Sequence, residues 1–175
     1  MKPVILSDTV RLISFFIFLC CAGAFLLQIP FAYKSGEAVP FIDALFTAVS
    51  AVCVTGLSTV DMEVYSRVGF IIIMILIELG GLGIISFISI FIGGSSKKVS
   101  LVNRRVVRRF SIDNIENNPR NIVKNILFYA FIIQGVGFLC LMPTLKMHGV
   151  EDFVFDALFL SVSAFCNAGF AVWAC

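Results

Sequence analysis

Charged residues are scarce in this sequence of 175 residues: Asp, Glu, Lys and Arg make up 14% of it, against about 25% in an average soluble domain. Apolar residues make up 59%, and the mean hydropathy is +1.02. This balance excludes an ordinary soluble enzyme and a disordered protein. A net charge of only +2 also argues against a nucleic-acid partner. The composition instead indicates a protein that crosses a lipid bilayer several times.

Residues of catalytic and metal-binding chemistry are equally scarce. With a single histidine the sequence offers no nucleophile–base pair, which disfavours a membrane-embedded enzyme. The six cysteines stand in apolar stretches without a CxxC pair, which predicts small buried hydrophobic residues rather than disulfides or metal ligands. The glycine-rich ELGGLGI at 78–84 lies inside an apolar run and lacks the strand-to-helix context of a phosphate-binding loop. The sequence therefore predicts neither an enzyme nor a resident cofactor.

What the sequence does contain is long apolar runs. The stretches 12–33, 68–96 and 125–145 are long enough to span a membrane, because a bilayer core of about 30 Å needs roughly 20 helical residues. Two shorter stretches, 41–60 and 153–175, are rich in Ser, Thr, Ala and Gly and break at a glycine. They are either short additional spans or, as we favour, re-entrant segments in which a half-length helix is followed by extended chain. The predicted fold is an all-α membrane protein.

Basic residues are distributed unevenly along these stretches. The segment 97–124 holds eight of the 13 Lys and Arg residues, and Lys2 and Arg11 precede the first span. Only Lys34, Arg67 and Lys146 fall on the opposite side. The positive-inside rule then places the N-terminus and the segment 97–124 in the cytoplasm, so that both half-length helices start from outside. Binding of anionic lipid or of a partner is an alternative role for the basic segment.

A repeat relates the two shorter stretches. Residues 43–57 read DALFTAVSAVCVTGL and residues 156–170 read DALFLSVSAFCNAGF; the offset is 113, and nine of the fifteen positions are identical. Each copy follows a predicted spanning helix. The predicted unit is thus a helix, a re-entrant half-length helix, a glycine-containing loop and a second helix. Internal repeats around a central site are a common plan of transport proteins.

An aspartate stands near the start of each predicted half-length helix. We predict that Asp43 and Asp156 cap the N-termini, where a carboxylate accepts hydrogen bonds from free amides and complements the positive end of the helix dipole. Ion binding is the alternative role for both. Each half-length helix then points its negative C-terminal end toward the middle of the membrane, which favours a cation over an anion.

The segments after the half-length helices have the composition expected of a backbone ion site. They read Val54-Thr55-Gly56-Leu57 and Asn167-Ala168-Gly169-Phe170. Glycine adopts positive φ at little steric cost, which lets successive carbonyl oxygens face one axis and replace the water shell of an alkali cation. We therefore predict that these eight residues form a selectivity filter. The hydroxyls of Thr55, Ser58 and Thr59 either add ligands at its mouth or cap their own loop.

Glu78 is the one ionisable residue inside a predicted span and away from its ends. Intramembrane carboxylates are costly and commonly mark an ion path or a buried pair. Gly80, Gly81 and Gly83 follow it and permit close helix contact. Glu78 is thus either an ion-handling group or a structural one, protonated or hydrogen-bonded to the backbone of a re-entrant segment.

The segments at 43–61, 78–87 and 156–170 together resemble the Trk/Ktr/HKT superfamily of cation transporters, and specifically the Ktr-type membrane subunit. The resemblance covers essentially the whole chain. It implies four covalently linked units around one pore, each with one filter loop, and makes Gly56 and Gly169 the filter glycines of the first two units. It also implies uptake of K⁺ across the plasma membrane, in many members coupled to or dependent on Na⁺. The partners it implies are a second copy of the subunit and a cytosolic ring of nucleotide-binding regulatory subunits.

The chain covers only part of that plan. Residues 1–96 correspond to the first pore unit, 97–124 to a basic cytoplasmic linker, and 125–175 to the start of a second unit. The second closing helix and two further units are missing, so the chain resembles an N-terminal portion whose remaining pore repeats come from the same full-length chain or from a second one. The alternative is a non-transporting membrane subunit or assembly partner of a split transporter. A four-subunit potassium channel is disfavoured, because the chain has no TVGYG-like filter.

Overall fold

The computed structural model describes residues 8–94 and 119–172, and every regular element in this part of the chain is helical. Five α-helices and two 3₁₀ turns follow one another: α1 (Asp8–Leu27), η1 (Pro30–Ala32), α2 (Phe41–Val52), η2 (Met62–Val64), α3 (Arg67–Gly94), α5 (Pro119–Met147) and α6 (Phe153–Phe165). The all-helical character agrees with the expected fold class. Residues 97–118 of the predicted basic linker lie outside the described residues.

The helix boundaries differ from the predicted spans at two places. Helix α1 ends at Leu27 rather than at 33, because Pro30 begins a separate 3₁₀ turn and the chain at Ile29 is extended. Helix α5 begins at Pro119, inside the stretch that we assigned to the linker. Proline suits the first turn of a helix, where its missing N–H group has no intrahelical partner. The last residues of the predicted linker are therefore helical.

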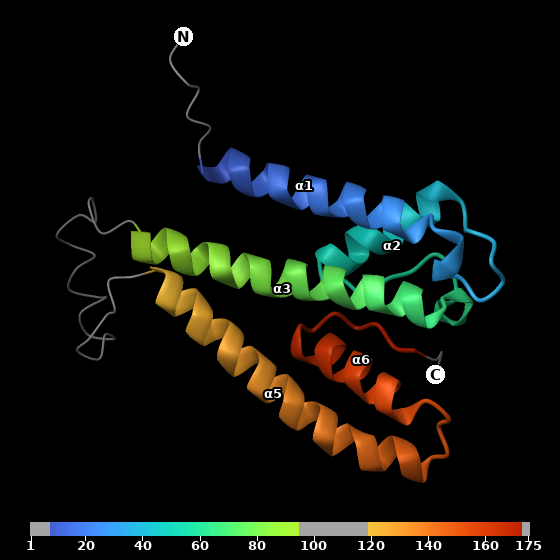
Figure 1. Ribbon diagram of the computed structural model, residues 1–175. Helices are drawn as coiled ribbons and strands as arrows, with labels where there is room; N and C mark the ends of the chain where they lie inside the picture. The colour runs from blue at the N-terminus through green and yellow to red at the C-terminus, as the bar shows by residue number, and fades with distance from the viewer. Residues whose placement is uncertain (1–7, 95–118, 173–175) are drawn as a thin grey trace.

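Three long helices and two short ones make up the arrangement in Figure 1. Helix α2 packs against α1 and α3, while α6 packs against α5 and α3. Both short helices begin at the end of the molecule where α1 ends and α3 starts. With 12 and 13 residues, α2 and α6 are only about 18–20 Å long. Neither crosses a bilayer core of about 30 Å, which disfavours the alternative of two additional full spans.

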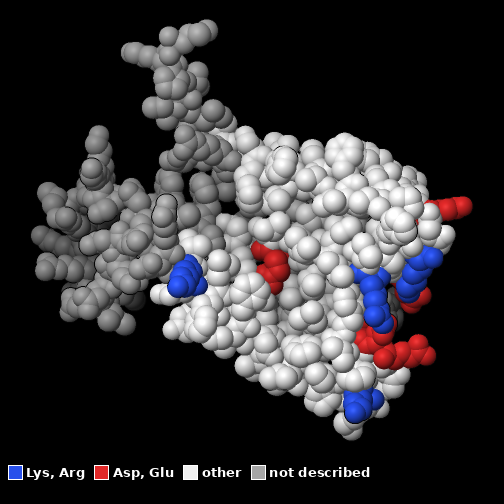
Figure 2. Space-filling model, in the orientation of Figure 1, with Lys and Arg blue, Asp and Glu red and all other residues white. Residues whose placement is uncertain are grey.

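The surface of the long helices is strongly apolar. By length and composition, Val123–Met147 of α5 is the one helix among the described residues that qualifies as a membrane span, while Ile13–Leu27 is a shorter apolar helix. Phe18 on α1 is 67% exposed and Phe131 on α5 is 61% exposed. Figure 2 shows a broad uncharged face, on which most of the coloured Lys, Arg, Asp and Glu of the described residues lie toward the end where α1 ends and α6 begins. Apolar surface of this extent marks an interaction face.

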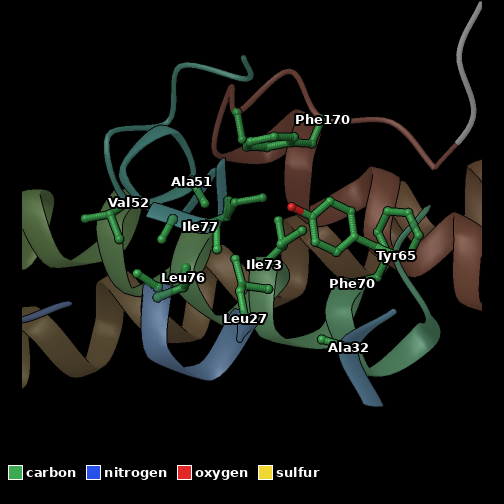
Figure 3. Packing of buried hydrophobic residues seen from close by; sticks show 14 of the residues in the cluster. Leu27, Ala32, Ala51, Val52, Tyr65, Phe70, Ile73, Leu76, Ile77 and Phe170 are labelled. Carbon is green, nitrogen blue, oxygen red and sulfur yellow. The ribbon is translucent and has the colours of Figure 1, made fainter. Parts of the chain in front are cut away.

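The core forms where small residues allow helices to approach closely. One face of α2 is lined by fully buried alanines, including Ala44, Ala48 and Ala51. A Cβ atom added to Gly80 of α3 would lie 2.1 Å from the carbonyl oxygen of Val52, so α3 touches the end of α2 backbone to backbone. Figure 3 shows the cluster at this contact, which includes Leu27, Ala51, Val52, Ile73, Leu76, Ile77 and Phe170. Of the glycines after Glu78, Gly80 thus permits close packing of α3 on the end of α2.

A second set of contacts ties the connecting segments together beside α2. Tyr33 and Tyr65 form an isolated antiparallel bridge. The Tyr65 hydroxyl donates a hydrogen bond of 3.2 Å to Thr47 Oγ1 on α2. The Ser66 hydroxyl donates one of 2.5 Å to the carbonyl oxygen of Phe31. These bonds join the segment before α2 to the segment after it, and so fix the position of the short helix.

The cysteines lie among apolar residues as expected, and those of the described residues are all free. The prediction that they are buried, however, holds only in part. Cys21, Cys53 and Cys140 are exposed on the surface of this chain, while Cys20 and Cys166 are partly buried. Because the exposed ones lie on or beside apolar helices, their neighbours in a bilayer would be lipid or further protein.

Candidate functional site

The two short helices end in the same hydrogen-bonded motif. In α2 the Val54 N–H group donates to the carbonyl oxygen of Ala51, and the Thr55 N–H group donates to that of Ser50, at 3.2 and 2.9 Å. In α6 the N–H groups of Asn167 and Ala168 make the corresponding bonds, at 3.0 and 2.7 Å. This pair of bonds defines the Schellman motif, which closes a helix through one residue in the left-handed region.

The loops that follow also share their backbone conformation. Val54 and Gly56 have φ values of 56° and 73°, and Asn167 and Gly169 have values of 58° and 75°. The left-handed residues therefore recur at the same repeat positions, 113 residues apart. Glycine and asparagine accept this region readily, whereas a β-branched valine is strained there. The first loop thus holds a strained valine at a position that is left-handed in both loops, which indicates that the local conformation is required.

The two glycines meet in space. A Cβ atom added to Gly56 would lie 2.3 Å from the carbonyl oxygen of Ala168 and 3.0 Å from the Cα atom of Gly169. A Cβ atom added to Gly169 would lie 3.6 Å from the Cα atom of Gly56, which is an ordinary contact. The fold thus brings the two predicted filter loops into direct backbone contact, and position 56 has no room for a side chain.

Hydroxyl groups of the first loop bond within their own unit. Thr55 Oγ1 donates to Ser50 Oγ at 3.0 Å, and Ser58 Oγ donates to the carbonyl oxygen of Val60 at 2.7 Å. Thr59 Oγ1 donates to the Asp43 carboxylate at 2.7 Å. Of the two roles considered for these hydroxyls, the hydrogen bonds favour the structural one: Thr55 and Ser58 bond close to their own loop, and Thr59 bonds to the first turn of α2. The oxygen atoms left for an ion are backbone carbonyls, and no group of three or more His, Cys, Asp or Glu side chains suited to a metal ion occurs in residues 8–94 and 119–172.

The prediction that Asp43 and Asp156 are N-caps is wrong. The N-cap residue of α2 is Pro40 and that of α6 is Asp152, and neither makes a side-chain capping bond. The predicted aspartates lie within the first turn instead, because each helix begins a few residues before the repeated DALF segment. An acidic side chain in the first turn still complements the positive end of the helix dipole.

Charges from both units meet where α6 begins. Arg67, the first residue of α3, forms an ion pair with Asp152, and both side chains are more than half exposed. A cavity of about 250 Å³ adjoins this pair and is also lined by Lys34 and Asp156. Asp156 is buried in the first turn of α6. The ion pair links the start of α3 to the start of α6.

Glu78 contacts the second unit rather than a re-entrant segment. Its Oε1 atom accepts a hydrogen bond from Gln134 Nε2 on α5, a residue that the sequence analysis did not single out. Its Oε2 atom is buried and has no hydrogen-bond partner in the described part of the chain. Ser161 of α6 donates to the carbonyl oxygen of Gln134 at 2.6 Å. Glu78 therefore belongs to a polar connection between α3, α5 and α6.

Two serines of the short helices also escaped the sequence analysis, although both belong to the repeated positions. Ser50 Oγ accepts a hydrogen bond of 2.8 Å from the Leu57 N–H group, and Ser163 Oγ donates one of 2.7 Å to the carbonyl oxygen of Phe170. Each serine thus ties its helix to the residue that follows the loop glycine. Their identity in both copies of the repeat was the available signal.

Known proteins share this sequence pattern. The chain matches the TrkH family, described as a cation transport protein, over residues 4–174. It is 39% identical over 159 residues to the potassium/sodium uptake protein NtpJ of Enterococcus hirae, covering 90% of this chain and 35% of that protein. It is 35% identical over 153 residues to the Ktr system potassium uptake protein B of Vibrio alginolyticus, covering 86% and 33%. It is 33% identical over 169 residues to the Ktr system potassium uptake protein D of Bacillus subtilis, covering 93% and 37%.

The matched proteins are ion transport proteins rather than enzymes. The chain belongs to the TrkH family of cation transport proteins. The resemblance drawn from the three sequence segments is thereby confirmed. The chain spans about a third of the length of the curated relatives it matches. All three are named for the uptake of potassium, and one of them also for sodium.

Proposed function

We propose that this chain supplies the first two filter loops of a pore for K⁺ uptake across the plasma membrane. The observation that carries the proposal is the pair of loops at 54–57 and 167–170, which share one backbone conformation and meet at Gly56 and Gly169. Backbone carbonyls held in this way suit an alkali cation, because they replace its water shell. The C-terminal ends of α2 and α6 add their negative dipole ends to the same place.

The membrane arrangement that we propose follows the helix–loop repeat. Residues 1–96 form the first pore unit, 97–124 a cytoplasmic connection that includes the first turns of α5, and 125–175 the beginning of the second unit. The N-terminus is cytoplasmic, because most basic residues lie on that side. Two loops close only part of a ring around an ion, so further units of the same kind complete the pore.

Two finer features come from the relatives rather than from the geometry. One relative is named a potassium/sodium uptake protein, which supports an involvement of Na⁺ in transport. Two others are named as parts of a Ktr system, which supports assembly with other components. We propose that the partner arrangement is a second copy of the membrane subunit and a cytosolic nucleotide-binding ring.

Two glycines with the same backbone conformation provide the test. Gly169 and Gly149 have φ values of 75° and 73°, and neither has a close steric obstacle to a Cβ atom. Alanine in this region is disfavoured by about 1–2 kcal/mol, so each substitution perturbs its own loop similarly. We expect Gly169→Ala to lower K⁺ uptake or its preference over Na⁺ about tenfold, since ~1.4 kcal/mol at the filter corresponds to that factor. Gly149→Ala should leave both unchanged.

The measurement uses the native full-length gene in cells that lack their own K⁺ uptake systems. Uptake of K⁺ and Na⁺ is normalised to the amount of protein in the membrane. Equal and unaltered uptake in both well-expressed variants would contradict the filter assignment. It would favour the alternative of a non-transporting subunit, which predicts that uptake depends on a second membrane chain.

A further inference from the structure

The two loops share their left-handed positions but differ in the hydrogen bond that a helix serine makes to the residue after the glycine. Ser50 and Ser163 occupy the same repeat position near the ends of α2 and α6, and are 4% and 2% exposed. Both reach the residue after the loop glycine, Leu57 or Phe170. In the first loop the serine oxygen accepts a bond from the N–H group of that residue. In the second loop the serine hydroxyl donates a bond to the carbonyl oxygen of that residue.

The consequence concerns the atoms left for a cation. In the second loop the Phe170 carbonyl oxygen is engaged at 2.7 Å by a buried hydroxyl, which directs it toward α6. In the first loop the bond of 2.8 Å engages the Leu57 N–H group, and no hydrogen bond to the Leu57 carbonyl oxygen occurs within the described residues. The two loops therefore offer different numbers of free oxygen atoms beyond their glycines.

The neighbouring residue explains the difference. Thr55 in the first loop brings a second hydroxyl to this serine, because its Oγ1 atom lies 3.0 Å from Ser50 Oγ and 3.2 Å from the Ser50 carbonyl oxygen. The equivalent residue of the second loop is Ala168, which has no hydroxyl to donate. Without a neighbouring hydroxyl, the hydroxyl proton of Ser163 goes to the Phe170 carbonyl oxygen. A difference of one side chain thus accompanies the reversed polarity of the serine bond.

We propose that Ser50 and Ser163 are positioning residues that decide which backbone atoms beyond the filter glycines face the ion. Ser163 withholds the Phe170 carbonyl oxygen from the pore, and Ser50 keeps the Leu57 N–H group away from it. The filter is therefore asymmetric between its first two loops. This inference rests on the proposed function, and it assigns a role to two residues that lie on the helices outside the loops themselves.

Opposite effects are expected when the two hydroxyls are removed. Ser163→Ala releases a carbonyl oxygen, which is a cation ligand, so the KM for K⁺ should fall about two- to tenfold, the factor that corresponds to one hydrogen bond. Ser50→Ala releases an N–H group, whose positive end repels a cation, so the KM should rise by a similar factor. In both variants Vmax per transporter should stay within about twofold. A merely structural role would lower the amount of protein or Vmax without moving KM in opposite directions.

The same helix offers a matched control. Ser161 is also buried, at 4% exposure, and its hydroxyl donates a bond of 2.6 Å to a backbone carbonyl, that of Gln134. Ser161→Ala therefore removes an equivalent hydrogen bond from α6 without touching the filter loop. We expect its KM for K⁺ to equal that of the wild type.

The assay is initial K⁺ uptake by the full-length protein at a series of K⁺ concentrations. A lowered KM for Ser163→Ala together with a raised KM for Ser50→Ala supports the inference. Changes of the same sign, or a KM for Ser163→Ala equal to that for Ser161→Ala, overturn it. If Gly169→Ala alters uptake while both serine variants keep the wild-type KM, only the role of the serines is wrong. If Gly169→Ala has no effect, the filter assignment itself is wrong.

Discussion

The contact between the two loops makes a quantitative prediction for Gly56→Ala. The new Cβ atom would lie 2.3 Å from the carbonyl oxygen of Ala168, so one loop must move by about 1 Å to restore an ordinary contact. Overpacking of this kind costs about 1–3 kcal/mol. The positive φ of 73° adds a further cost of about 1–2 kcal/mol. The free energy of unfolding should therefore fall by about 2–5 kcal/mol.

Gly36 separates the two contributions. It has the same φ value of 73°, and nothing lies within 4 Å of the position that its Cβ atom would occupy. Gly36→Ala should therefore lower the free energy of unfolding only by the backbone cost of about 1–2 kcal/mol. The two variants and the wild type would be compared by denaturant unfolding in the same detergent. If Gly56→Ala is no less stable than Gly36→Ala, the direct contact between the loops at 56 and 169 does not exist.

Two further predictions concern residues around this contact. Asn167 is exposed and left-handed, with φ of 58°. Asn167→Val should lower the free energy of unfolding by about 1–2 kcal/mol, because a β-branched residue is disfavoured in this region. An unchanged unfolding curve would contradict the assigned conformation. Gln134→Leu removes the donor to Glu78 and should cost about 1–3 kcal/mol, because it leaves a buried carboxyl unpaired. Adding Glu78→Leu should recover part of that loss, and a double variant as unstable as Gln134→Leu would disprove the pairing.

Much of the candidate site was readable from the repeat. The DALF segments predicted two equivalent short helices, and the glycines at equivalent positions predicted two equivalent loops. The structure agrees because the determinants are local: each Schellman motif joins residues no more than five positions apart. Because these hydrogen bonds join residues within the repeated segment, two segments with nine identities in fifteen positions adopt one shared backbone conformation. The helix starts were less predictable, and the aspartates were placed at N-caps that belong to Pro40 and Asp152.

Helix ends and side-chain partners depended on contacts that the repeat does not contain. Helix α1 stops at Leu27 because Pro30 starts a turn whose Ala32 carbonyl accepts a bond from Ser66, far along the chain. Glu78 was expected to be either an ion-handling group or a structural one, protonated or bonded to a re-entrant backbone, and its partner is Gln134. Such pairs form when two helices pack, and the spacing of residues along one helix gives no information about its neighbour.

By itself, then, the sequence determined that the protein is an apolar, all-helical member of a cation transport family with two related loops, because composition and local hydrogen bonding follow directly from residue order. Only the tertiary structure decided that Gly56 and Gly169 touch, that α3 packs on the end of α2 through Gly80, and that the two serine bonds run in opposite directions. These features depend on atoms that packing brings within a few ångströms of each other. At such short distances, one methyl group or one hydroxyl proton decides between packing or hydrogen-bond arrangements that the sequence alone does not distinguish.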